Sequence, residues 1–167
     1  MEMIPQPKTP LSASLLRIAM GWLFLWAFID KLWGLGYATA AAKSWINGGS
    51  PTYGFLKMGA KGVFAPLFQA LAGKAIIDWL FMLALLGIGV ALLLGVAIRF
   101  ASICGVVLVV MMWMVVLPPA NNPIIDDHII YALVFLLMAY QPLFFSRLSF
   151  YSQWLPSRFV QRMPWMK

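Results

Sequence analysis

Residues 11–33 read LSASLLRIAMGWLFLWAFIDKLW, a run in which apolar side chains far outnumber all others. A helix needs about 20 mainly apolar residues to cross the hydrocarbon core of a bilayer, and this run is long enough. Thr9 and Pro10 precede it, and a capping residue followed by proline is typical of a helix start. The run therefore predicts a transmembrane helix.

The composition of the whole chain also indicates a membrane protein. Of the 167 residues, 63% are hydrophobic and 10% are charged, and the mean hydropathy is +0.88. Soluble domains contain roughly 45–50% apolar and 25% charged residues. Because so little polar material is available to cover a water-facing surface, most of the surface is expected to face lipid.

Three further apolar runs reach or approach the length of a membrane span: residues 78–98, 100–117 and 127–145. Backbone that faces lipid must satisfy its N–H and C=O groups within the segment, so each run is predicted to be a helix. We predict an all-α integral membrane four-helix bundle that forms a single transmembrane domain over residues 1–167.

A long connection, residues 34–77, joins the first two spans. A turn signal at residues 48–51 separates two weakly amphipathic stretches, 37–45 and 63–71, which are predicted to be short interfacial helices. Residues 146–167 mix aromatic and basic side chains, a pattern typical of a tail that lies on the membrane surface.

The distribution of charge predicts a cell-membrane protein with both termini in the cytoplasm. The side of the termini and of the second-to-third connection carries all five arginines and two lysines, whereas the other side carries five lysines and four of the five acids. Cytoplasmic segments of membrane proteins are enriched in lysine and arginine.

Several other classes of function are disfavoured. The net charge of +7 could suggest nucleic acid, but the basic residues flank apolar runs and form no dense stripe. The lone Cys104 allows no disulfide within the chain and is interpreted as a small buried hydrophobe. The single His128 cannot supply two axial haem ligands, and no spacing indicates a metal site.

Residues 38–40 resemble a signal-peptidase site, but the preceding apolar run is too long for a signal peptide. The first helix is therefore expected to remain in the mature protein.

Gly87, Ala91 and Gly95 form a small-residue stripe that allows another helix to approach closely. Packing within the bundle is the preferred interpretation of this stripe, and a contact in a homo-oligomer is the alternative.

Polar residues at the outer ends of three spans are expected to converge at one membrane face. Asp78, Asp126 and Asp127 precede or open helices, where a carboxylate caps free N–H groups. Asp30 lies at the C-terminal end of its helix, where the helix dipole disfavours an anion, so it needs a partner or a function; Lys31 and His128 are candidate partners.

Arg17 and Asp30 are 13 residues apart, about 20 Å of helix. Because the hydrocarbon core is about 30 Å thick, one of them must lie inside it, and Arg17 is expected to reach for the inner interface.

An aromatic face leads toward Asp30. Trp22, Trp26, Asp30 and Trp33 share one side of the first helix. A row of tryptophans beside one carboxylate suits a flat, apolar, redox-active ring such as a quinone; the equally weighted alternative is a belt of lipid-facing or core tryptophans.

Two segments carry a resemblance to a known family. Residues 16–26 followed by Asp30-Lys31-Leu32 resemble the first-helix motif of the DoxX-like membrane proteins. Residues 45–51, together with Asn121-Asn122-Pro123 leading into 126–132, resemble the DoxD-type branch, the membrane subunit of thiosulfate:quinone oxidoreductase. The likeness covers roughly residues 11–145. It implies thiosulfate oxidation on the outer side, transfer of electrons to a membrane quinone, and a second protein subunit.

We therefore interpret the chain as the quinone-reactive membrane subunit of a sulfur-compound oxidoreductase. The predicted site residues are Asp30, Asp127 and His128 for catalysis, Trp22, Trp26, Trp33 and Tyr131 for the quinone cofactor, and Lys31 and Asp126 for substrate. The alternative is a non-catalytic scaffold that anchors a soluble redox partner at the bilayer. A transporter is less favoured because no inverted repeat is evident.

Overall fold

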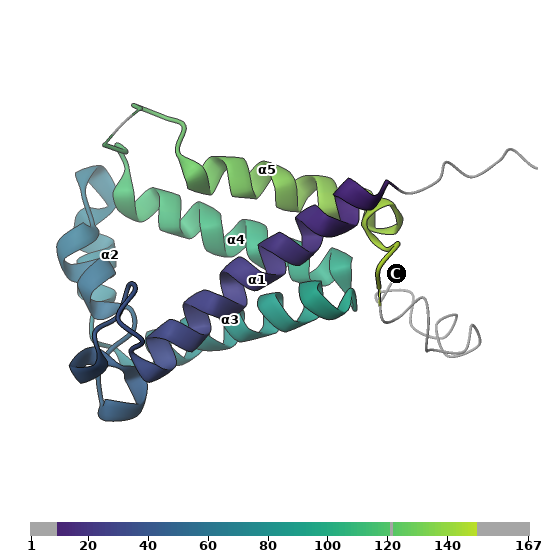
Figure 1. Ribbon diagram of the computed structural model, residues 1–167. Helices are drawn as coiled ribbons and strands as arrows, with labels where there is room; N and C mark the ends of the chain where they lie inside the picture. The colour runs from purple at the N-terminus through teal and green to yellow at the C-terminus, as the bar shows by residue number, and fades with distance from the viewer. Residues whose placement is uncertain (1–9, 121, 150–167) are drawn as a thin grey trace, which may run out of the picture.

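The computed structural model describes residues 10–120 and 122–149, which form helices and turns without any strand. Within these residues the chain forms five α-helices, which are labelled in Figure 1. They are α1 (Leu11–Trp33), α2 (Ala65–Leu71), α3 (Ala75–Leu94), α4 (Ile98–Val116) and α5 (Asp127–Tyr140). Shorter helical turns are η1 (Ala41–Lys43), η2 (Trp45–Asn47), η3 (Phe55–Gly59), η4 (Gly62–Phe64) and η5 (Pro142–Phe145).

Three helices, α1, α3 and α4, are long and apolar enough to cross a membrane, judged by length and composition. The predicted helix over residues 127–145 is too long: α5 has 14 residues and ends at Tyr140. Pro142 lacks a backbone N–H and disfavours the helical conformation at Gln141, so the chain leaves α5 there and continues as η5.

The bounds of α1 agree with the predicted run, but those of α3 lie earlier than the predicted 78–98. Gly95, with φ 68°, adopts the left-handed conformation and ends α3. The predicted third helix, 100–117, forms as α4, which begins at Ile98 and ends at Val116. Hydropathy therefore located the helices, whereas glycine and proline set their ends.

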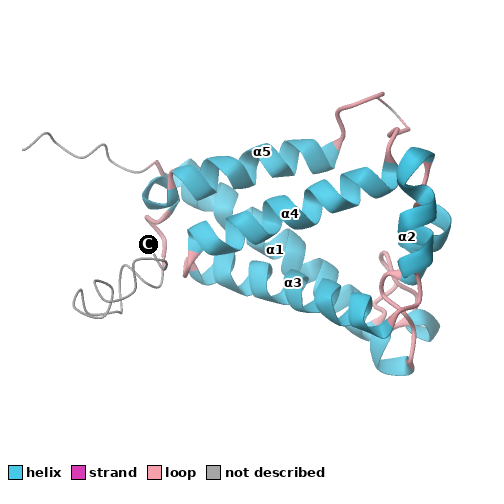
Figure 2. Cartoon of the chain, turned by 180° about the vertical axis from the view of Figure 1, so that it is seen from behind, coloured by secondary structure: helices cyan, strands magenta, loops and turns pink. Residues whose placement is uncertain are grey.

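The four longer helices pack in two pairs. α1 packs along α3, α4 packs along α5, and α3 joins the two pairs through its contact with α4. Figure 2 shows α3 and α4 diverging from their short connection, with α2 lying across the open end. The beginning of α1 and the end of α5 lie together at the opposite end of the molecule, as Figure 1 also shows.

Glycines bring the paired helices close together. A Cβ on Gly89 would lie 2.7 Å from the backbone nitrogen of Leu25, and one on Gly21 would lie 2.8 Å from that of Leu93. On α4, Gly105 lies against the ring of Phe135. The two glycines of the predicted small-residue stripe do not make such helix crossings. Gly87 has open space around it, and Gly95 lies beside Arg17 and Ser149.

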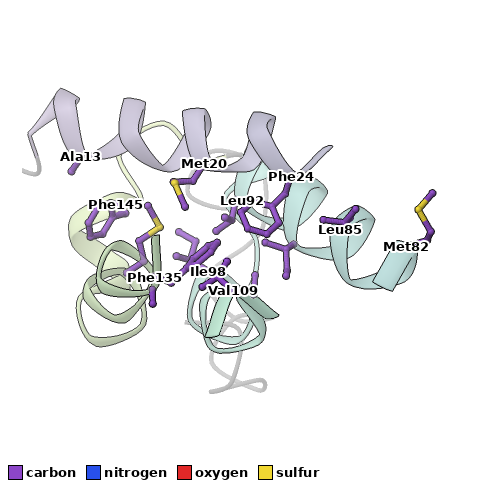
Figure 3. Close-up of a cluster of buried hydrophobic side chains, with 14 residues drawn as sticks. Ala13, Met20, Phe24, Met82, Leu85, Leu92, Ile98, Val109, Phe135 and Phe145 are labelled. Atoms are coloured by element: carbon purple, nitrogen blue, oxygen red, sulfur yellow. The ribbon is translucent and has the colours of Figure 1, made fainter. Parts of the chain in front are cut away.

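The apolar core lies between these two helix pairs (Figure 3). Phe24 of α1 packs edge-to-face on Phe135 of α5, with ring centroids 5.3 Å apart. Met20 and Leu92 belong to the same buried cluster. Burying such side chains in the interior gives each helix a fixed inner face, while the opposite faces expose many large apolar residues.

Arg17, a basic residue inside the first predicted span, is buried within the protein. It is 0% exposed, and its guanidinium donates to backbone carbonyls from two other parts of the chain. Nε donates to the oxygen of Phe145 at 2.9 Å, Nη2 to that of Leu148 at 2.8 Å, and Nη1 to that of Leu92. The last carbonyls of a helix lack partners within it and carry its negative dipole end, so they compensate the buried cation.

The long connection contains less regular helix than predicted in its first half. Stretch 37–45 holds η1 and the beginning of η2, whereas stretch 63–71 becomes η4 and α2. Most of the predicted surface-lying tail, residues 150–167, lies outside the described residues.

Replacing Gly89 with leucine is expected to destabilise the fold, because the new side chain would collide with the backbone of Leu25. Overpacking of this kind costs about 1–3 kcal/mol or more. Gly87→Leu on the same helix is the matched control, since its Cβ meets nothing within 4 Å. Thermal unfolding in detergent compares them, and equal melting temperatures would contradict the close α1–α3 crossing.

Candidate functional site

The polar residues singled out near the ends of the spans gather at the end of the molecule opposite the start of α1 and the end of α5. The last turn of α1, the first turn of α3, α2 and the start of α5 all lie at this end (Figure 1). The side chains, however, fall into separate local arrangements.

Asp30 is 1% exposed, and backbone groups explain how its carboxylate is satisfied. Oδ2 accepts a hydrogen bond from the N–H of Ala38 at 2.9 Å, and Oδ1 accepts one from Tyr37 at 3.3 Å. The carboxylate thus fastens the segment that follows its own helix. Within the described residues it forms no salt bridge with Lys31 or His128, the two partners considered for it.

Asp78 bonds across to the long connection instead of capping its own helix. It is 6% exposed, and its Oδ1 accepts from the hydroxyl of Thr52 at 2.6 Å, the hydroxyl of Ser50 at 2.9 Å and the N–H of Thr52 at 3.1 Å. The sequence had indicated a helix cap here. The donors come from the turn after Gly49, which the sequence could not place beside α3.

Asp126 is the N-cap of α5, as predicted. Its Oδ1 accepts from the backbone N–H groups of His128 and Ile129, while Oδ2 lies 2.7 Å from Nδ1 of His128. A carboxylate bonded to Nδ1 orients the imidazole and leaves Nε2 available. Asp127, the next residue, is exposed.

The predicted tryptophan face of α1 lies largely on the outside. Trp22 is 52% exposed and Trp33 is 51% exposed. Trp26 contacts Trp22, with centroids 5.6 Å apart, and Tyr37, at 5.1 Å. Because Tyr37 is also held by Asp30, this aromatic row runs up to the Asp30 carboxylate. Tyr131 instead packs against the buried core.

An apolar cavity of about 500 Å³ lies between α3 and α4, where these helices diverge. We call it the α3–α4 cavity. Its walls include Phe81 and Ala84 of α3 and Cys104 of α4, and the long connection closes it with Phe55 and Phe68. Lys31 is the sole charged residue in its lining, and Thr52 is the other residue there with a polar side chain.

A second cavity, of about 610 Å³, lies beside the start of α5, and we call it the outer cavity. Its charged lining consists of Lys61, Asp126, Asp127 and His128. Two carboxylates against one ammonium make this cavity acidic while the imidazole is neutral. No group of three or more His, Cys, Asp or Glu within the described parts of the chain is arranged to hold a metal ion.

The predicted site residues therefore lie in separate parts of the structure and do not form one site. Lys31 lines the α3–α4 cavity, and the Asp126-Asp127-His128 segment lines the outer cavity. The aromatic residues predicted to hold the cofactor, Trp22, Trp26, Trp33 and Tyr131, line neither of these two cavities.

Sequence reasoning missed the lining residues that the long connection contributes. Phe55, Phe68 and Thr52 come from segments without a strong helical or motif signal. For Phe55 and Phe68 the one sequence signal is an aromatic side chain in a connection rich in glycine and alanine. That signal does not show which helices the connection packs against.

Comparisons of the chain with protein-family models, with curated proteins and with solved structures find no match. The DoxX-like resemblance consequently remains a prediction that depends on the residues quoted for it.

Removing the Asp30 carboxylate is expected to release the segment around Tyr37 and Ala38. In Asp30→Ala these two amides lose their acceptor, so they should exchange hydrogen for deuterium at least tenfold faster, as mass spectrometry of detergent-solubilised protein can measure. Asp127→Ala, which removes an exposed carboxylate, is the control. Unchanged exchange in Asp30→Ala would show that the carboxylate does not hold this segment.

Proposed function

We propose that the chain is a quinone-reactive membrane subunit of an oxidoreductase and that the ring binds in the α3–α4 cavity. The observation that carries the proposal is an apolar cavity of about 500 Å³ with a single ammonium group in its wall. Binding sites for small lipophilic molecules are mostly apolar and contain a few polar groups that orient the ligand.

The cavity's chemistry suits a quinone. A quinone has a flat apolar ring with carbonyl oxygens at opposite edges, and phenylalanines supply apolar contact for such a ring. The Lys31 ammonium can donate to one carbonyl and stabilise the negative charge that develops there on reduction. Leu80, Ile103 and Val107 both line the cavity and are about half exposed, which supports entry from the lipid side.

The proposed position differs from the one expected on the tryptophan face. Trp22 and Trp33 are about half exposed and line neither of the two cavities described above. Tryptophans at the ends of a span commonly anchor it at the membrane interface, and we assign that role to Trp33, the last residue of α1; Trp22, in the middle of α1, would face lipid.

A second subunit fits the proposed reaction. Two thiosulfate ions and one quinone give tetrathionate and quinol with the uptake of two protons, so two electrons must reach the ring. The outer cavity has two carboxylates against Lys61, a charge balance that disfavours an oxyanion. We therefore place sulfur oxidation on the partner and quinone reduction on this chain, in keeping with the DoxD-type resemblance.

We further propose four membrane crossings with cytoplasmic termini. The short α5, about 21 Å of helix, would supply the fourth crossing together with local bilayer thinning. Arg99 and Arg147 then lie on the cytoplasmic side, and the lysine-rich long connection lies outside.

Cysteine labelling tests this topology. In a Cys104→Ser background, a cysteine replacing exposed Lys57 should react with a membrane-impermeant maleimide on intact cells, whereas one replacing exposed Arg99 should react only after the membrane is opened. The reverse pattern would place the termini outside.

Quinone binding tests the proposed function directly. Purified protein should retain a membrane quinone, or added decylubiquinone, in near-stoichiometric amount after gel filtration. Ala84→Leu fills part of the cavity and should weaken binding at least tenfold, while Gly87→Leu on the same helix should leave it unchanged. Lys31→Met should weaken binding about tenfold, because it removes a charged hydrogen-bond donor.

Two results would overturn the proposal. Absence of retained quinone from the wild-type protein would do so, as would equal binding by the Ala84 and Gly87 variants. Co-purification of a soluble redox protein without any quinone would instead support the scaffold alternative.

A further inference from the structure

Asp78 is a buried carboxylate that does not line the α3–α4 cavity but is hydrogen-bonded to a residue that does. Thr52, which lines that cavity, donates its hydroxyl hydrogen bond to Oδ1 of Asp78 at 2.6 Å. Ser50 donates to the same oxygen at 2.9 Å and is less buried than Thr52. The three side chains form a continuous hydrogen-bonded chain between the cavity wall and the outer loop.

Helix capping does not account for this arrangement. The acceptor oxygen is occupied by donors from residues 50–52, and the structure shows no bond from it to the N–H groups of α3. A hydroxyl both donates and accepts hydrogen bonds, so Thr52 can pass a proton in either direction. Asp78 is therefore a buried proton acceptor connected to the cavity by a single hydroxyl.

We propose that Asp78 exchanges protons with the quinone through Thr52, and that Ser50 connects Asp78 to the outer aqueous side. The proposal depends on the proposed function, since it requires a ring in the α3–α4 cavity. Asp78 does not touch the ring, so its role is that of a proton-relay residue.

The chemistry of the relay balances. On reduction, the ring gains two electrons from the sulfur-compound donor and two protons. For each proton, the Asp78 carboxyl donates to the Thr52 oxygen while the Thr52 hydroxyl proton moves to a ring oxygen. Asp78 then regains a proton from the outer side by way of Ser50. Quinol oxidation runs the same path in reverse.

The one charged group of the cavity lining is consistent with this role. The Lys31 ammonium lines the same cavity and stabilises negative charge on a ring oxygen before the proton arrives.

A purely structural role for Asp78, in which it only holds the turn at residues 50–52, would also explain these hydrogen bonds. Asp78→Asn separates this structural role from the proton relay. The asparagine oxygen still accepts from Thr52 and Ser50, but the amide cannot carry a proton. Thr52→Val provides a second variant, which keeps the Asp78 carboxylate and removes the hydroxyl link. Thr39→Val in the same connection is the matched control.

The experiment uses purified full-length protein loaded with one equivalent of decylubiquinol and oxidised by ferricyanide. Each quinol gives one quinone, two ferrocyanides and two protons, which ring absorbance and an indicator dye follow separately. We expect Asp78→Asn and Thr52→Val to retain quinol but to oxidise it at least tenfold more slowly than wild type. Wild type and Thr39→Val should share a fast rate with a solvent deuterium isotope effect.

The outcomes distinguish the two proposals. If Asp78→Asn binds quinol and oxidises it at the wild-type rate, the relay is overturned while the cavity remains a quinone site. If Asp78→Asn loses quinol binding altogether, its role is structural and the relay is again overturned. If wild-type protein retains no quinol, both the proposed function and the relay fail.

Discussion

The buried guanidinium of Arg17 is the interaction on which the arrangement of the helices depends most. It joins the first helix to the end of α3 and to the segment after α5 through carbonyls of Leu92, Phe145 and Leu148. A cation in apolar surroundings is costly unless it is fully compensated. Because carbonyls from α3 and from the segment after α5 supply that compensation, the two helix pairs are fixed relative to each other at the end where α1 begins and α5 ends.

This anchoring helps to explain why a cavity forms at the other end. α3 ends and α4 begins close to Gly95, and the two helices diverge toward the other end of the molecule, where α2 and η3 fill only part of the space between them (Figure 2). Close glycine crossings hold α1 on α3 and α5 on α4, so neither outer helix moves inward to fill it. The hydrogen bonds of Thr52 to Asp78 hold the part of the long connection that lines the cavity.

Much of the fold could be read from periodicity and hydropathy, because a membrane segment must satisfy its own backbone and expose apolar side chains. The first helix was predicted to the residue. The ends of α3 and α5 were not, since Gly95 and Pro142 act through backbone conformation rather than hydropathy. For the candidate site, the residues flagged by charge do lie at one end, but their grouping could not be predicted.

Hydropathy and charge spacing were enough to predict an apolar helical protein, a cap at Asp126, and a pair of charges, Arg17 and Asp30, only 13 residues apart in one span. How those two charges are satisfied depends on tertiary packing, because their partners are backbone groups, which every residue carries and no pattern singles out. Tertiary packing alone also brought Ser50 and Thr52 to Asp78 and formed the α3–α4 cavity. Both depend on where a weakly patterned connection folds, and that is set by packing between distant segments.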